Sequence, residues 1–162
     1  MSEIPDLLER FRRGTDLVAE AGAGADRSEW DWSPASGKWS IRQIMCHLAD
    51  SELVGADRFR RVIAEENAVL QAYDQDAWAD RLDYRTREFS QALESFRRLR
   101  MENYELLKGL PEDGFVRTGK HSERGTVTLK DLLLTYIEHA EAHARQIRGT
   151  RDAFTQSRAT RK

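Results

Sequence analysis

Residues 127–144 read VTLKDLLLTYIEHAEAHA, and this stretch carries the clearest helical pattern of the chain. Thr128 followed three residues later by Asp131 is typical of a helix N-terminus, where the two side chains satisfy backbone N–H groups of the first turn. Gly149 stands where such a helix would end. We therefore predict a helix over about 128–148. Its apolar side chains recur at spacings of three and four residues: Leu129, Leu132, Leu133, Tyr136, Ala140 and Ala144.

Three other segments show the same periodicity, over about 4–22, 40–66 and 82–108. The second of them has a well-marked start, because Ser40 and Gln43 can form a reciprocal capping box. Longer connections join the four segments: about 23–39, 67–81 and 109–127. Four amphipathic helices of this length predict an all-α four-helix bundle.

The composition is that of a single domain. The 162 residues correspond to about one domain. Hydrophobic residues make up 40% and charged residues 33%, which excludes a disordered chain. We expect one four-helix-bundle domain over 1–150. The basic tail over 151–162 lacks helical periodicity, and we expect it to be frayed.

Composition also excludes several classes of protein. No apolar run approaches the length of a membrane span, and the first residues do not have the pattern of a signal peptide, so we expect a cytoplasmic protein with no membrane partner. The net charge of −2 argues against a nucleic-acid partner. The single cysteine, Cys46, excludes an internal disulfide and a cysteine-rich zinc site. We expect Cys46 to be buried and inert.

His139 and His143 are the strongest chemical signal in the sequence. Residues four apart on a helix lie one above the other, within reach of one metal ion. Both histidines lie on or beside the apolar stripe, so we expect them to point inward. Unpartnered imidazole nitrogens would be costly there, and a shared metal ion would satisfy them.

A metal site needs a third ligand, and His47 is the candidate. Its distance from the start of its helix can bring it to the same end of the bundle as His139 and His143. It follows Ser40 by seven residues, whereas His139 and His143 follow Thr128 by eleven and fifteen. The three imidazoles meet only if the second and fourth helices run antiparallel. A plain up-down-up-down bundle makes those helices parallel, so the metal hypothesis predicts a crossover connection. The 15 residues of 67–81 are long enough to span a helix of about 40 Å.

Asp50 and His121 are the candidates for a catalytic role beside the metal. Asp50 lies one turn after His47 and can either orient an imidazole or face solvent. His121 stands in a loop of glycine, serine and arginine, where we expect it at the surface or beside a ligand. Arg58 can bind a carboxylate of a substrate. We interpret Arg58, Arg60, Arg61 and the run 97–100 mainly as solvated helix faces.

Five stretches of the chain form a specific combination: WSIRQI at 39–44, HLADSE at 47–52, NAVLQAYDQDAW at 67–78, HSERGTVTL at 121–129 and HAEAHARQI at 139–147. Together these stretches resemble the DinB-like (YfiT/DinB) superfamily of small helical bundles. The resemblance covers about residues 4–149.

The resemblance implies an up-down-down-up bundle, which agrees with antiparallel second and fourth helices. It implies a divalent metal ion, zinc or nickel, bound by His47, His139 and His143. Members of the superfamily often form homodimers. Some are thiol S-transferases or isomerases that use bacillithiol, mycothiol or glutathione-like thiols, and others resemble metal-dependent hydrolases.

Two functions follow as hypotheses. Three neutral imidazoles leave a metal ion with an open coordination position, which is typical of a catalytic site. We expect a metal-dependent enzyme, a thiol S-transferase or a hydrolase, in which a metal-activated thiol or water attacks a small molecule. The alternative is a non-catalytic metal-binding stress-response bundle. We expect the aromatic connections Trp30–Trp39 and Tyr73–Trp78 to cover the mouth of the site.

Overall fold

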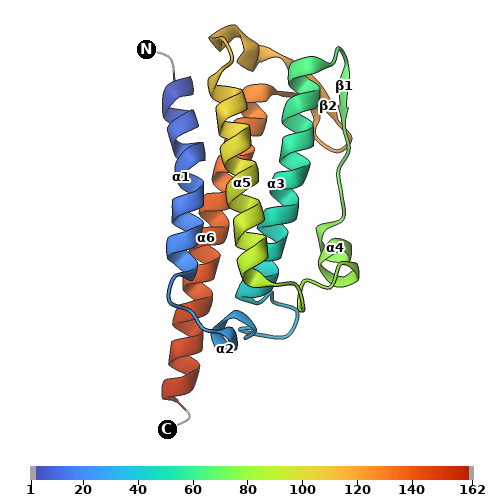
Figure 1. The fold of residues 1–162 in the computed structure, drawn as a ribbon. Coiled ribbons are helices and arrows are strands. Elements are labelled where there is room, and N and C mark those ends of the chain that lie inside the picture. Colours follow the sequence, from blue (N-terminus) through green and yellow to red (C-terminus); the bar gives the residue numbers. More distant parts are fainter. Residues whose placement is uncertain (1–2, 161–162) are drawn as a thin grey trace.

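The computed structural model describes residues 3–160 and shows an all-α four-helix bundle with a small sheet at its side (Figure 1). The bundle consists of α1 (Ile4–Gly22), α3 (Ile41–Ala64), α5 (Phe89–Lys108) and α6 (Leu129–Ala159). Helices α1 and α6 run in one direction, and α3 and α5 run in the other (Figure 1). This is the up-down-down-up arrangement, and it confirms that α3 and α6 are antiparallel.

Both predicted capping boxes are present. The Ser40 hydroxyl accepts from the Gln43 backbone N–H, and the Gln43 side chain accepts from the Ser40 backbone N–H at 3.0 Å. Thr128 and Asp131 repeat the arrangement at the start of α6. Each box satisfies donors that a helix N-terminus would otherwise leave unpaired, so the two helices that carry the histidines begin at well-defined residues.

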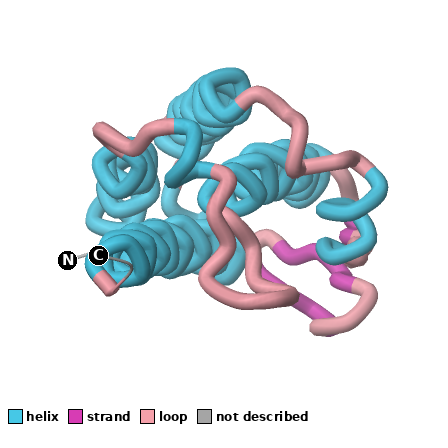
Figure 2. Tube along the Cα trace, turned by 90° about the horizontal axis from the view of Figure 1, so that it is seen from below, coloured by secondary structure: helices cyan, strands magenta, loops and turns pink. Residues whose placement is uncertain are grey.

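Several short elements were not predicted. They are α2 (Arg27–Trp30), α4 (Gln75–Arg81), the 3-10 helix η1 (Glu112–Val116), and the strands β1 (Ala68–Leu70), β2 (Thr118–His121) and β3 (Gly125–Thr128). Strand β2 pairs in parallel with β1 and antiparallel with β3. The three strands lie to one side of the bundle (Figure 2). Strands of three or four residues are too short to show the alternation by which a sequence indicates a strand.

The sheet packs closely on α3 because β2 contains Gly119. A Cβ atom at this position would lie 2.9 Å from Cγ2 of Val62. The third predicted helix also begins later than expected, at Phe89 instead of about residue 82. Leu82 is the C-cap of α4 and Asp83 has a positive φ of 49°, which interrupts the helical path.

The C-terminal tail is helical up to Ala159, contrary to the prediction of a frayed segment. Helix α6 continues through Gly149 to Ala159 and reaches beyond the other helices (Figure 1). Arg151 forms an ion pair with Glu29 of α2 and donates to the carbonyl oxygens of Ala21, at 3.1 Å, and Ala23, at 2.8 Å. The prediction of a frayed tail is therefore wrong for residues 151–159, because the tail binds to the α1–α2 region. Its last two residues lie outside the described range.

The interior of the bundle also contains a buried ion pair. Arg100 and Glu52 are at most 1% exposed, and Nη2 of Arg100 lies 2.8 Å from Oε2 of Glu52. Interpreting the run 97–100 as a solvated face is thus wrong for Arg100. No helix among residues 3–160 is long and apolar enough to cross a membrane.

Candidate metal centre

The bundle brings His47, His139 and His143 together. Nε2 of His139 lies 2.9 Å from Nε2 of His47 and 3.1 Å from Nε2 of His143. One donor nitrogen from each ring falls within 4.8 Å of the other two. This convergence needs the antiparallel packing of α3 and α6, since His47 lies early in its helix and the other two lie well along theirs.

The nitrogen geometry fits a bound cation. Three imidazole nitrogens that share one point cannot all be satisfied by hydrogen bonds among themselves, because a neutral ring nitrogen is either a donor or an acceptor. Nδ1 of His143 lies 2.8 Å from Oε1 of Gln146 and donates to it, which leaves Nε2 of His143 as a bare lone pair. Metal–nitrogen bonds near 2.1 Å place the ligand nitrogens of a tetrahedral site about 3.4 Å apart, close to the spacing seen here.

Burial keeps the three imidazoles neutral. It lowers the pKa of His47 to about 4, an effect that His143 reinforces and Asp50 opposes. It also lowers the pKa of His139, with His143 and His47 adding to the effect, and that of His143, where Gln146 opposes it. Neutral imidazole is the form that binds a metal, so the lone pairs are available at neutral pH.

A cavity of about 420 Å³ opens onto His139, His143 and Gln146. Its other walls are Gly37, Lys38, Trp39, Gln75 and Asp76. The ring of Trp39 also packs on His47, with centroids 4.9 Å apart. Of the two aromatic connections expected to cover the site, residues 37–39 and 75–76 line this cavity, and Trp39 is the aromatic residue among them.

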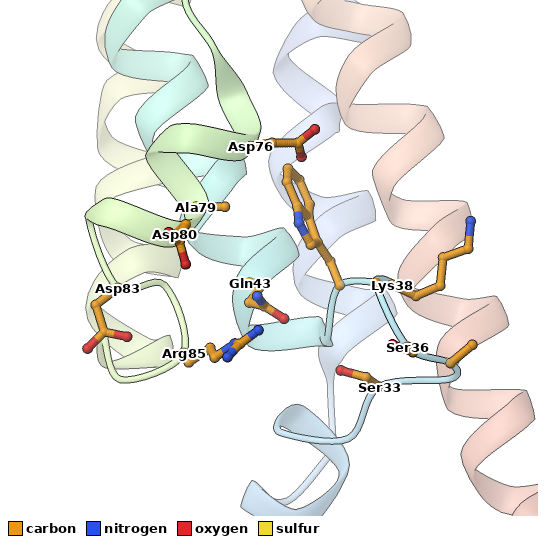
Figure 3. A pocket seen from close by; sticks show the side chains of 12 residues that line it. Ser33, Ser36, Lys38, Gln43, Asp76, Ala79, Asp80, Asp83 and Arg85 are labelled. Atoms are coloured by element: carbon orange, nitrogen blue, oxygen red, sulfur yellow. The ribbon is translucent and has the colours of Figure 1, made fainter.

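A second hollow of about 410 Å³ adjoins the first and shares Trp39 and Asp76 with it. Figure 3 shows Ser33, Ser36 and Lys38 of the loop on one side and Asp76, Ala79 and Asp80 of α4 on the other. Gln43 and Arg85 also line this hollow (Figure 3). The histidines therefore lie beside a groove that is large enough for a small molecule.

Asp50 does not orient His47. Its Oδ2 accepts from the Tyr84 hydroxyl and from Nη1 of Arg87, each at 2.7 Å. Nδ1 of His47 has no hydrogen-bond partner among the described residues. Asp50 therefore ties the segment after α4 to α3. Cys46 is buried as predicted, and burial raises the pKa of its thiol to about 11.

His121 is neither at the surface nor beside a histidine of the centre. It is 6% exposed and ends β2, where Nδ1 accepts from the backbone N–H groups of Glu123, at 3.2 Å, and Arg124, at 3.4 Å. The expectation of a surface position is therefore wrong, because the side chain closes the β2–β3 turn. Burial, together with the charges of Arg58 and Arg124, lowers the pKa of His121.

Gln146 is a site residue that the sequence analysis did not assign. The signal was present, because Gln146 follows His143 by three residues and so lies on the same helix face. Nothing in the pattern distinguished it from the other polar residues at the end of that helix. Only the packed structure shows that its amide oxygen contacts the imidazole.

Comparisons with known proteins find a family and several relatives that are similar to this chain. The DinB superfamily matches residues 10–147. A protein of Oceanobacillus iheyensis named "Putative metal-dependent hydrolase" is 32% identical over 147 residues, which cover 91% of this chain and 81% of the relative. YfiT of Bacillus subtilis carries the same description and is 31% identical over 121 residues, covering 74% of this chain and 68% of YfiT.

The fold matches a solved structure of YfiT from Bacillus subtilis with a TM-score of 0.88 and 25% sequence identity. The match covers 96% of this chain and 90% of that one. That structure is described as "a probable metal-dependent hydrolase with an unusual four-helix bundle topology". The two proteins therefore share the bundle fold over nearly the whole of this chain, a larger part than the 74% over which their sequences align.

Proposed function

The chain belongs to the DinB superfamily, and on that premise we propose that it is a metal-dependent hydrolase of a small molecule. The observation that carries the proposal is the meeting of three neutral imidazole nitrogens beside an open cavity. Three histidines that leave a fourth coordination position open form the donor set of a catalytic zinc site such as that of carbonic anhydrase. The names of the relatives support hydrolysis and not thiol transfer.

Each residue of the centre has a defined part in the proposal. His47, His139 and His143 would hold a divalent ion, and Gln146 keeps the ring of His143 oriented. Zinc and nickel are the ions we propose, because imidazole nitrogen is a suitable ligand for both. When bound, such an ion lowers the pKa of a bound water toward about 7 and so supplies a nucleophile at neutral pH.

The walls of the cavity restrict what can reach the histidines. Trp39 lines the cavity, and its ring packs on His47. This ring shields His47 from bulk water on one side and offers an apolar surface to a substrate, whereas Lys38, Gln75 and Asp76 offer polar groups. We also propose that the protein works as a homodimer. Measuring its molar mass in solution tests this.

Elemental analysis of untagged protein, together with a panel of esters and amides, tests the proposal. We expect about one divalent ion per chain and hydrolysis without added thiol. His139→Ala should lose both the ion and turnover, whereas Arg145→Ala, an exposed change on the same helix, should keep both. His121→Ala should keep its metal, because His121 binds backbone amides instead.

Two outcomes would contradict the proposal. Turnover that depends on glutathione, bacillithiol or mycothiol would replace hydrolysis by thiol transfer. A stoichiometric ion with no turnover of any ester or amide, with or without thiol, would support the non-catalytic metal-binding bundle.

A further inference from the structure

Arg58 of α3 is a cation without a carboxylate partner among residues 3–160. Its Nη2 donates to the backbone oxygen of Gln71 at 2.8 Å, and its Nη1 donates to the Tyr136 hydroxyl at 3.3 Å. Its Nε is buried without a hydrogen-bond partner. A guanidinium has five N–H donors, so most of its capacity is unused. By contrast, Arg61, one turn further, is paired with Asp57 and Glu65.

The groups around Arg58 are mainly hydrogen-bond donors. Burial raises the pKa values of Tyr136 and Tyr73. The positive charge of Arg58 lowers both pKa values and so partly offsets that rise, because it lies near the two hydroxyls. His121 accepts at Nδ1 from two backbone amides, so its proton is on Nε2, where it is a donor. Of the carboxylates whose charges act on the two tyrosines, Asp50 is bound by Tyr84 and Arg87, and Glu52 is bound by Arg100 and Asn103. Such an arrangement favours an anionic ligand.

Arg58 lies on the same side of α3 as the metal centre. Ser51 and Arg58 follow His47 by four and eleven residues, close to one and three whole turns, so the three share a face of the helix. The long side chain of a helical arginine leans toward the N-terminus of its helix, which here brings the guanidinium back toward His47.

Tyr136 connects this position to α6. It precedes His139 by three residues, one turn away. Its ring packs closely against Gly55 of α3, where an added Cβ would be 2.7 Å from Cε1 of the ring. Gly55 thus lets the tyrosine cross the helix interface and place its hydroxyl beside Arg58. Along the α3–α6 interface, the three histidines are therefore followed by the hydroxyl of Tyr136 and then by the guanidinium of Arg58.

We propose that Arg58, assisted by the hydroxyl of Tyr136, binds a carboxylate of the substrate, so that the enzyme acts on carboxylate-bearing small molecules. This inference rests on the proposed hydrolase function. It states what binds one end of the substrate, the carboxylate end, while the group that reacts lies at the histidines. Guanidinium and carboxylate match as planar groups and form paired hydrogen bonds, which a lysine ammonium does not reproduce.

Dicarboxylates of graded length test the subsite in the metal-loaded protein. Isothermal titration with acetate measures binding of one carboxylate at the metal. In the series from succinate to suberate, we expect at least one member to bind roughly tenfold more tightly than acetate, because its second carboxylate reaches Arg58. Arg58→Gln should remove that gain, and Arg58→Lys should keep only part of it.

Arg61→Gln is the matched control, since it removes the same charge one turn away from a residue that already has carboxylate partners. It should leave the dicarboxylate preference unchanged. Equal affinity of acetate and every dicarboxylate, or an unchanged preference in a folded Arg58→Gln variant, would overturn the subsite. Turnover of neutral esters in that case would leave the hydrolase proposal standing. A preference that Arg58→Gln abolishes, in a protein that hydrolyses nothing, would retain the subsite and overturn hydrolysis.

Discussion

Gln146 shows how one uncharged residue can prepare a metal ligand. Its amide oxygen lies 2.8 Å from Nδ1 of His143 and selects the tautomer in which Nε2 is free. His47 has no such partner, so its orientation depends on packing against Trp39. The two imidazoles are thus held by different physical means.

We predict that Gln146→Ala lowers metal affinity by roughly tenfold to a hundredfold, the range found for groups that hydrogen-bond to metal-ligating histidines. Gln146→Glu retains an acceptor at this place and should restore most of the affinity. Competition with a chelator of known affinity measures the effect. Equal affinities of the wild type and the alanine variant would show that Gln146 does not orient His143.

The C-terminal part of α6, residues 150–159, packs against α2 and the end of α1. Arg151 joins this helix to α2 through Glu29 and to the end of α1 through two backbone oxygens. Trp32 and Phe154 pack edge to face, with ring centroids 5.6 Å apart. These contacts hold the connection 23–39, whose far end borders the histidine cavity.

Truncation after Gly149 is therefore expected to destabilise the protein by about 1–3 kcal/mol, because it removes the ion pair and the partly buried hydrogen bond of Arg151 together with an aromatic contact. Urea unfolding of the metal-free protein measures the change. Truncation after Ser157 is the control and should have little effect, since it keeps Arg151 and Phe154. A stability equal to that of the full chain after the longer truncation would show that the tail contacts contribute nothing.

The four long helices of the bundle are connected through a buried ion pair in its interior. Arg100 of α5 binds Glu52 of α3, the backbone oxygen of Phe11 in α1 at 3.3 Å and that of Tyr136 in α6 at 2.9 Å. Its guanidinium also lies 4.2 Å from the ring centroid of Phe11. Gly14 leaves the room, because a Cβ there would be 2.5 Å from Nη1 of Arg100. This side chain of α5 thus contacts the other three long helices.

Arg100→Met is expected to lower the free energy of unfolding by about 3–5 kcal/mol, since it leaves Glu52 buried without its charged partner. The double variant Arg100→Met, Glu52→Leu should recover much of that loss, because no uncompensated charge remains. Urea unfolding of both variants tests this, with the exposed Arg97→Ala as a control. A single variant as stable as the wild type would show that the pair does not hold the helices together.

By itself the sequence determined the four long helices, two of their N-termini and the histidines that converge. Apolar periodicity and capping pairs are local, so they can be read without knowledge of the fold. The antiparallel relation of α3 and α6 also followed from the sequence, because the levels of His47, His139 and His143 along their helices agree in only that arrangement. The resemblance to the superfamily added the order of the helices.

Only the tertiary structure decided which polar residues serve the site and which hold the fold. Asp50 and Arg100 are polar residues of helices, and their side-chain partners lie 34 to 89 residues away along the chain. Local pattern cannot predict such partners, because a buried ion pair and a solvated charge have the same sequence signature. The same reason applies to the tail, whose helix contacts α2 through Arg151. It applies also to Arg58, which the sequence offers as a ligand for a substrate carboxylate and which has no carboxylate partner among residues 3–160.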